Sequence, residues 1–251
     1  MSQDRKAVTA IILAAGYGRR LGEIHNEPKV LLEFEGRSLL ERRLEALSAA
    51  GIRTVSITVG YEADRVRAEV DRIGAPIEVR YVHNPRFREG SLLSLLVQRK
   101  VLEGGGPVLV MDGDVLHDQR MVERLFSGSG EAVLLVDPEL EPGDEPVKVC
   151  FRGDTIVDFR KRPEFAHDRH GESVGFFYFS PRVARLLAER CAVLAEGEGG
   201  GLEYEEAIRD LILADPAMFS AEDVGDLPWT EIDFAEDVVR AREVILPQLL
   251  D

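Results

Sequence analysis

The sequence predicts an α/β fold of three layers, α/β/α, in which a mostly parallel central sheet lies between two layers of helices. Strand-like and helix-like segments alternate up to Asp137, which is the pattern of successive βαβ units. The strand-like segments are continuous apolar runs, as expected of parallel strands that are buried on both faces. The 251 residues are enough to bury a substantial core around such a sheet.

The first strand is expected at 7–14, where the apolar run AVTAIILA ends before a glycine. A helix is expected at 38–51, because Ser38 and Glu41 form a capping-box pattern and Gly51 marks a stop. The alternation then continues with strands at 54–60, 77–84, 107–115 and 131–137, and with helices at 62–74, 90–106 and 121–126.

After Asp137 the rhythm changes and predicts a small β-rich subregion. Residues 147–161 form a hairpin pattern, two strand-like runs around Gly153 and Asp154, and a further strand is expected at 172–180. Helices are expected at 181–196, 203–214 and 235–250, with a short strand just before the last one. Because no linker or repeat divides the chain, we expect a single domain, 1–251, with a first part at about 1–137 and a second at about 138–251.

The charge of the chain is strongly uneven. The formal net charge is −15, and residues 196–251 hold 16 acidic residues against three arginines. Such a surface repels a phosphate backbone, so nucleic acid is not an expected partner. Most of these acids are expected to form a solvated face, and a subset could hold a divalent metal or a cationic substrate group.

Composition places the chain among ordinary globular proteins, with 45% hydrophobic and 31% charged residues. Cys150 and Cys191 are too few for a disulfide framework, and the five histidines have no zinc-ligand spacing. No apolar run approaches the roughly 18 residues needed to span a bilayer, and the first residues lack the apolar core of a signal peptide. We therefore expect a cytoplasmic protein without membrane insertion.

A glycine-rich stretch, LAAGYGRRLGEIHNEPK, follows the first strand at residues 13–29. Its three glycines are spaced G-x-G-x-x-x-G, one residue too long for a dinucleotide fingerprint. That fingerprint also needs an acidic residue at the end of the second strand, and here the second strand ends too far along the chain. It lacks the lysine of a P-loop, and it does not lie in the β-hairpin of a kinase loop. What remains is a glycine turn followed by two arginines and by Lys29, a set suited to binding phosphate oxygens.

The pattern LAAG-x-G-x-R-x-G with a downstream PK resembles the signature of the sugar-phosphate nucleotidyltransferase superfamily, the pyrophosphorylase type. The resemblance covers the chain from Val8 to about Arg242 and implies a Rossmann-like nucleotidyltransferase fold, with nucleotide binding in the first part and acceptor binding in the second. It implies Arg20, rather than Arg19, and Lys29 as the catalytic cations. In that superfamily the loop binds the nucleotide, which implies roles here for Leu13, Ala14, Ala15, Gly16, Gly18, Arg20 and Lys29.

Paired carboxylates follow a predicted central strand in VLVMDGDV. Asp112 and Asp114 lie at its carboxyl end, where open α/β sheets bind ligands, and Mg²⁺ prefers such hard oxygen donors. The resemblance implies Asp114 as a metal ligand. Asp112 is expected either as a helper to that ligand in the nucleotide site or as a turn residue at the end of the strand. A second segment, PWTEIDFAED, resembles the W-x-E-I-D element of the choline-phosphate cytidylyltransferase branch, which implies Asp233 as a ligand and Glu231 as its partner.

The resemblance also implies an acceptor side. Lys161 in FRKRPE resembles the lysine of the family's E-K-P element, which holds the acceptor phosphate, although an arginine precedes it here. Lys148 resembles a lysine of cytidylyltransferase relatives, and Gly175 a glycine near the acceptor. Glu203 and Tyr204 start a predicted helix, either as first-turn acids that complement its dipole or as part of a site for an ammonium group.

The reaction implied is attack of an acceptor phosphate or phosphonate oxygen on the nucleotide α-phosphorus, with one or two Mg²⁺ ions and release of pyrophosphate. The resemblance is closest to the phosphocholine, inositol-phosphate and aminoalkylphosphonate cytidylyltransferases. We therefore expect CTP as donor, a small phosphorylated alcohol or phosphonate as acceptor, and a homodimer as a possible assembly. Two alternatives stay open: a hexose-1-phosphate nucleotidyltransferase using UTP, dTTP or GTP, and a catalytically silent, nucleotide-sensing subunit.

Overall fold

A nine-stranded mixed sheet forms the centre of the computed structural model, which describes residues 5–18, 20–21, 27–140, 146–197 and 201–249. Its parallel part runs in the order β5–β4–β1–β6. These strands span Glu78–His83, Thr54–Val59, Thr9–Ala14 and Val108–Asp112. All four were expected from their apolar runs, and their carboxyl ends meet at one edge of the sheet.

The rest of the sheet is mostly antiparallel and is built around one long strand, β11 (Arg169–Phe179). Its first half pairs with β9, its second half pairs with β6, and β8 lies along the other side. The remaining strands are β8 (Ala132–Asp137), β9 (Lys148–Arg152), β10 (Thr155–Arg160) and β12 (Phe219–Asp223). The predicted hairpin is confirmed as β9 and β10.

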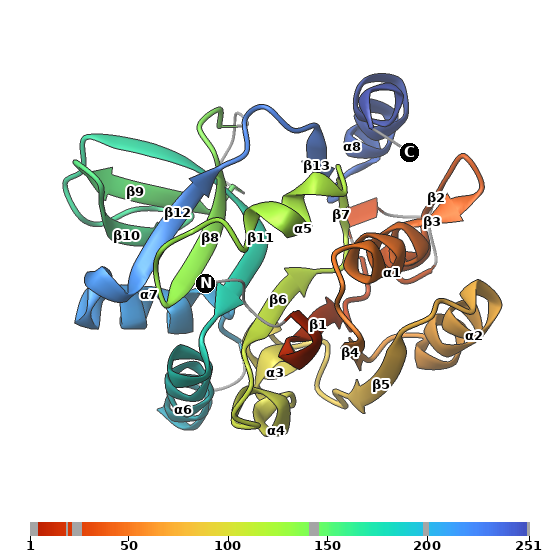
Figure 1. Cartoon of the computed structure of the whole chain (residues 1–251), viewed down its shortest axis with the longest axis horizontal. Coiled ribbons are helices and arrows are strands. Elements are labelled where there is room, and N and C mark those ends of the chain that lie inside the picture. Colours follow the sequence, from red (N-terminus) through yellow and green to blue (C-terminus); the bar gives the residue numbers. More distant parts are fainter. Residues whose placement is uncertain (1–4, 19, 22–26, 141–145, 198–200, 250–251) are drawn as a thin grey trace.

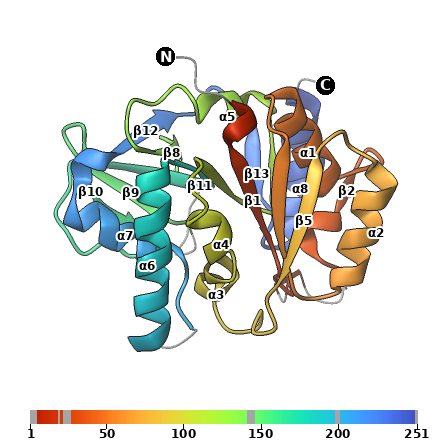
Figure 2. The same ribbon diagram turned by 60° about the horizontal axis from the view of Figure 1, so that its bottom comes forward.

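Helices cover both faces of the sheet (Figure 1, Figure 2). One face carries α1 (Leu39–Ala49), α2 (Ala63–Ile73) and α5 (Arg120–Arg124). The other carries α3 (Ser91–Leu96), α4 (Arg99–Leu102), α6 (Pro181–Gly197) and α7 (Glu205–Ala214). Side chains of β1 alternate between the two cores, Ile12 packing in the same cluster as Leu44 of α1 and Ile11 in the same cluster as Leu187 of α6. The predicted three-layer α/β/α fold is confirmed.

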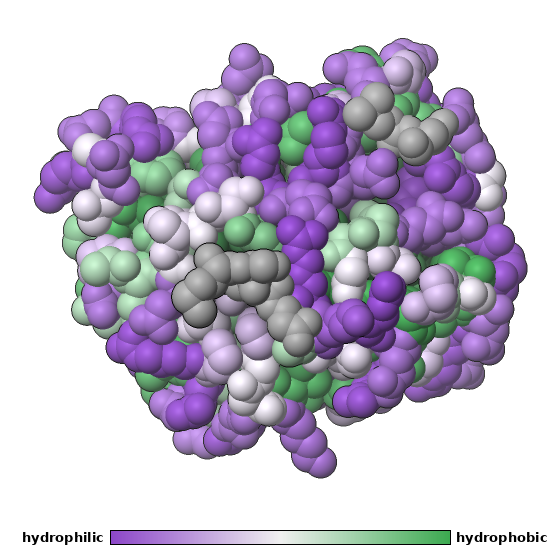
Figure 3. All heavy atoms as spheres, in the orientation of Figure 1, coloured by the Kyte–Doolittle hydropathy of each residue, from purple (hydrophilic) through white to green (hydrophobic). Residues whose placement is uncertain are grey.

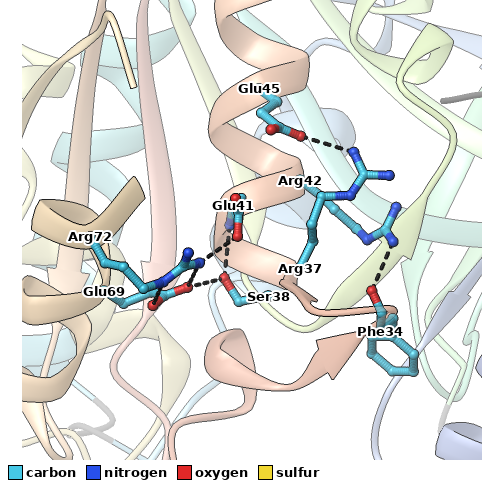
Figure 4. A network of polar contacts seen from close by, with 8 residues as sticks. All are labelled: Phe34, Arg37, Ser38, Glu41, Arg42, Glu45, Glu69 and Arg72. Atoms are coloured by element: carbon cyan, nitrogen blue, oxygen red, sulfur yellow. Dashed lines mark hydrogen bonds and ion pairs between the residues drawn. The ribbon is translucent and has the colours of Figure 1, made fainter. Parts of the chain in front are cut away.

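The start of α1 shows why its sequence forms a helix there. Ser38 is the N-cap, and its Oγ accepts a hydrogen bond of 3.0 Å from the backbone N–H of Glu41. The same hydroxyl donates to Glu69 of α2 at 2.6 Å, and Arg72 bridges Glu69 and Glu41 (Figure 4). The hydrogen bond from Arg72 lowers the pKa of Glu69. The cap therefore also joins α1 to α2.

Two predicted helices differ from the structure. The expected helix at 90–106 is interrupted at Val97 and Gln98, which separate α3 from α4. The expected helix at 235–250 begins as α8 (Ala235–Arg240), continues as a π-helical turn at Ala241–Ile245, and ends as a 3₁₀ turn at Leu246–Gln248 that contains a proline.

Short elements connect the two parts of the chain. β7 (Val115–His117) pairs with β13 (Trp229–Glu231), and β12 joins β8 of the first part.

The remaining short elements of the described residues are a hairpin and three turns. The hairpin of β2 (Glu33–Phe34) and β3 (Arg37–Ser38) precedes α1. Short 3₁₀ turns lie at Arg5–Ala7, Lys29–Leu31 and Pro216–Met218.

The surface is largely polar on the face drawn in Figure 3, where apolar side chains form small patches between hydrophilic ones. Among the described residues, every helix is too short or too polar to cross a membrane.

Candidate active site

A cavity of about 370 Å³ opens where the carboxyl ends of β1 and β6 meet the middle of β11. This is the place where open α/β sheets bind ligands. Most residues singled out from the sequence line it: Leu13, Ala14, Ala15, Gly16, Gly18, Arg20, Lys29, Asp112, Asp114, Lys161, Gly175, Glu203, Tyr204, Glu231 and Asp233. The structure therefore brings together segments that lie more than 200 residues apart.

Three carboxylates in the cavity are placed to share one cation. Asp114, in the turn between β6 and β7, Glu231, at the end of β13, and Asp233 each offer an oxygen, and these oxygens lie within 4.8 Å of one another. The backbone N–H of Ile232 donates to the carbonyl of Asp114 at 2.9 Å, which fixes the two segments side by side. Hard oxygen donors of this kind fit Mg²⁺.

The electrostatics of this triad agree with a cation site. Enclosure in the cavity, followed by the charges of Asp114 and Asp233, raises the pKa of the Glu231 carboxyl well above its usual range. Concentrated negative charge is costly without a counter-cation, so the three carboxylates favour a divalent ion or a cationic side chain.

Lys29 and Arg20 supply positive charge beside the triad. The Lys29 ammonium donates to Asp233 at 2.5 Å and to Asp114 at 3.0 Å, and Arg20 donates to Asp233 at 2.7 Å. Burial alone would lower the pKa of Lys29, but the two carboxylates raise it, so the ammonium stays charged. Gly18, at φ +64°, lets the Lys29 stem pass, because a Cβ there would lie 3.2 Å from the lysine Cγ. Arg19, which was not expected to be a catalytic cation, lies outside the described residues.

Asp112 lies next to the triad and is held from three sides. The hydroxyl of Tyr204 donates to its carboxylate at 2.7 Å, and Arg43 donates to its backbone carbonyl at 2.7 Å and to that of Val115 at 3.0 Å. At Gly175, φ +77°, a Cβ would lie 2.2 Å from an Asp112 carboxylate oxygen, so only glycine fits. Burial, then the charges of Glu205 and Asp114, raises the pKa of Asp112.

The predicted acceptor residues differ in their placement. Lys161, Gly175 and Glu203 line the cavity, and the Glu203 carboxylate accepts a hydrogen bond from Ser91. The ring of Tyr204 is only 1% exposed and packs edge-on against Phe177 in the core, so its hydroxyl, not its ring face, reaches the site. Lys148 is not among the described residues that line the cavity. Its ammonium donates to the backbone carbonyl of Lys161 at 3.0 Å.

Sequence reasoning missed several residues that line the cavity. Phe87, Arg88 and Ser91 follow β5 and form one wall, and the signal was available, because the loop after a parallel strand lies at the ligand-binding edge. Glu205 follows the predicted acceptor residues Glu203 and Tyr204 directly but was not among the predicted site residues. It lines the cavity, and burial, followed by the charge of Glu203, raises its pKa to about 8.

The chain has recognisable relatives. It is 31% identical over 247 residues to the bifunctional IPC transferase and DIPP synthase of Rubrobacter xylanophilus, covering 96% of this chain and 53% of that one. It is 28% identical over 241 residues to the CMP-5'-(3-aminopropyl)phosphonate synthase of Streptomyces rubellomurinus, covering 92% of this chain and 37% of that one. The chain thus spans about half the length of the first relative and little more than a third of the second.

A solved structure shares the fold. The inositol-1-phosphate CTP transferase from T. maritima superposes with a TM-score of 0.73 at 21% identity, covering 97% of this chain and 98% of that one. In addition, residues 10–189 match the family model described as the MobA-like NTP transferase domain. This match spans most of the chain and includes the glycine-rich loop, Lys29, Asp112 and Asp114; the chain belongs to the MobA-like NTP transferase family.

Proposed function

We propose that this protein is a Mg²⁺-dependent cytidylyltransferase that transfers CMP from CTP to a small phosphorylated alcohol or a phosphonate, with release of pyrophosphate. The observation that carries the proposal is the convergence of Lys29 and Arg20 on the Asp114–Glu231–Asp233 triad beside the glycine-rich loop. Phosphoryl-type transfer between two anions needs this combination of cations and metal ligands. The names of the relatives support CTP as the donor, since one makes a CMP-phosphonate and one is a CTP transferase.

The residues of the chain divide the chemical work. An acceptor oxygen forms a bond to the α-phosphorus while the bond to the bridging oxygen breaks and pyrophosphate leaves. Asp114, Glu231 and Asp233 would hold Mg²⁺, which supplies neutralisation of the phosphate charges when bound. Lys29 and Arg20 bind oxygens of the α-phosphate and stabilise the charge that develops there. Lys161 binds the phosphate or phosphonate of the acceptor and orients it for in-line attack.

In this proposal the cavity has a nucleotide side and an acceptor side. The loop 13–18 and the loop after β5, from Phe87 to Ser91, form the nucleotide side. Lys161, Gly175 and Glu203 form the acceptor side. We propose that 1–137 and 138–251 divide the two substrates in this way, while the metal triad takes ligands from both.

A panel of donors and acceptors tests the proposal. Purified protein with Mg²⁺ is assayed for pyrophosphate release from CTP, UTP, dTTP and GTP. Each nucleotide is combined with phosphocholine, phosphoethanolamine, 2-aminoethylphosphonate, inositol 1-phosphate or a hexose 1-phosphate. We expect CTP with one of the first four acceptors to give the highest kcat/KM, and EDTA to abolish the activity.

Two other outcomes would contradict the proposal. Highest turnover with a hexose 1-phosphate and UTP, dTTP or GTP would identify a hexose-1-phosphate nucleotidyltransferase. Nucleotide binding without turnover on any combination would identify a catalytically silent, nucleotide-sensing subunit.

A further inference from the structure

Five buried polar side chains form a ladder behind the nucleotide side of the cavity. The Ser56 hydroxyl donates to the side-chain oxygen of Gln98 at 2.7 Å, and the Gln98 amide donates to the Thr58 hydroxyl at 2.9 Å. Thr58 donates to the backbone carbonyl of Ser94 at 3.0 Å, and the Asn84 amide donates to the Ser94 hydroxyl at 3.0 Å. All five residues are at most 7% exposed. We call Ser56, Thr58, Asn84, Ser94 and Gln98 the polar ladder.

The polar ladder holds both ends of the loop that forms the nucleotide wall. Asn84 directly follows β5, and its side-chain oxygen accepts a hydrogen bond of 2.9 Å from the backbone N–H of Arg86. Ser94, on α3, itself lines the cavity. Phe87, Arg88 and Ser91 lie between these two anchors. The loop 85–91 is therefore fixed to the central strand β4 through Thr58, which donates to the carbonyl of Ser94, and Gln98 in turn donates to the Thr58 hydroxyl and orients it.

The ladder also explains the break between α3 and α4. Gln98 lies at the break, with φ −82° and ψ 8°, and points its amide at β4. A buried amide costs free energy unless both ends are paired, and an apolar side chain of the same size would serve burial alone at least as well. The paired amide contributes positional specificity. Hydrogen bonds are directional and fix the position of the loop, whereas apolar contacts would allow several positions.

A second network, built on the buried pair Asp158 and Arg209, holds the acceptor side. Asp158 is fully buried, and its carboxylate accepts from the backbone N–H groups of Glu164 at 2.7 Å and Phe165 at 3.1 Å. Arg209 of α7 donates to Asp158 at 2.6 Å and to the Glu164 carboxylate at 2.9 Å. We call Asp158, Glu164 and Arg209 the acceptor clamp. It ties the turn that carries Lys161 to the helix that begins just after Tyr204.

We propose that Gln98 and Arg209 are positioning residues that set the two sides of the cavity separately, Gln98 for the nucleotide and Arg209 for the acceptor. The proposal rests on the function proposed above. The polar ladder and the acceptor clamp share no residue: the ladder joins β4, the end of β5 and the α3–α4 region, whereas the clamp joins β10 and the turn after it to α7. The two sides of the cavity meet at Ser91, which donates to Glu203 and accepts from the backbone N–H of Tyr204, but these bonds involve no residue of the ladder or of the clamp. A fault in one network should therefore leave the other side of the cavity in place.

A crossed pair of variants tests this separation. Gln98→Met and Arg209→Met each replace a polar end by an unbranched apolar chain. Gln98→Met should raise the KM for CTP about ten-fold and leave kcat and the acceptor KM within about two-fold, the size of effect expected when one or two buried hydrogen bonds are lost. Arg209→Met should raise the KM for the acceptor about ten-fold and leave kcat and the KM for CTP within about two-fold. Because Arg209→Met leaves a buried carboxylate uncompensated, the milder Glu164→Gln, and Ser56→Ala for the ladder, serve as second variants.

Amide hydrogen exchange gives a readout that does not depend on turnover. Gln98→Met should speed exchange in peptides that cover 85–93 and leave 161–167 unchanged, and Arg209→Met should do the opposite. Two results would overturn the proposal. One is a variant in which exchange becomes faster, or KM rises, on both the nucleotide side and the acceptor side. The other is a variant in which neither side changes. Absence of turnover in the unmutated protein would contradict the proposed function instead, while exchange would still decide the positioning.

Discussion

Lys29 lies 85 residues before Asp114 and 204 residues before Asp233, and its ammonium contacts both carboxylates. The glycine-rich loop makes this possible, since Gly18 leaves room for the lysine stem, and the 3₁₀ turn Lys29–Leu31 fixes the backbone. A motif could therefore predict which residue carries the charge. The contact with both carboxylates could not be predicted, because it depends on the pairing of β7 with β13.

Replacing Lys29 tests its proposed role at the α-phosphate. Lys29→Met should lower kcat/KM about 10²–10³-fold, the usual effect of removing one group that stabilises transition-state charge. Asp114→Asn should have an effect of similar size, whereas Lys100→Met, at an exposed site on α4, should stay within about two-fold. Steady-state kinetics with circular dichroism as a folding check makes the measurement. Near-normal activity of Lys29→Met would remove this residue from the mechanism.

His117 makes a pH-dependent contribution to stability outside the site. It is buried on β7, its Nδ1 lies 2.8 Å from the carbonyl of Asp118, and its Nε2 has no partner among the described residues. Burial, followed by the positive charge of Arg43, lowers its pKa to about 3 from 6.5. The unfolded chain therefore takes up this proton first as the pH falls. The associated stability is complete above about pH 6.5 and is lost progressively between pH 6.5 and pH 3.

A His117→Gln variant isolates this effect from the carboxylates that titrate in the same range. Between pH 7 and pH 5 the free energy of unfolding of the unmutated protein should fall by about 2 kcal/mol more than that of the variant. Urea unfolding at several pH values measures the difference. Parallel curves for the two proteins would show that His117 is not the titrating group.

At the scale of elements, local sequence patterns predicted the helices and strands that depend on local interactions. The capping residues of 38–51 predicted α1, and the apolar runs predicted the parallel strands. The helix expected at 90–106 was wrong as a single helix, because Gln98 is bound to Ser56 and Thr58 on a distant strand. The pairing of β7 with β13 was not predictable either, since each strand has three residues and more than 100 residues separate them.

The N-cap of α1 offers a stability test that should leave the site intact. Ser38→Ala removes the bond to the Glu41 N–H and the bond to Glu69 of α2. We expect the free energy of unfolding to fall by about 1–2 kcal/mol with unchanged kcat. Ser38→Thr keeps the hydroxyl and should recover most of the stability. An unchanged midpoint in Ser38→Ala would mean that water or another group replaces the cap.

At the scale of the whole molecule, the uneven charge has a partial explanation in the site. Residues 196–251 hold 16 acidic residues, and among those that the structure describes four line the cavity, namely Glu203, Glu205, Glu231 and Asp233. The sequence could indicate that a subset of these acids would serve a cation, but only the fold shows which of them meet in the cavity. Lys148 illustrates the same limit, because a lysine that holds the backbone of Lys161 has no sequence pattern of its own. The homodimer and the cytoplasmic location stay predictions.

Label transfer from CTP tests the central claim most directly. The protein is incubated with Mg²⁺, the best acceptor and CTP labelled either at the α- or at the γ-phosphorus. The account predicts that the α-label appears in a CMP–acceptor product and the γ-label in pyrophosphate, and that both are lost in Asp114→Asn. Transfer of the γ-label to the acceptor, or release of the α-label as free CMP with no adduct, would contradict it.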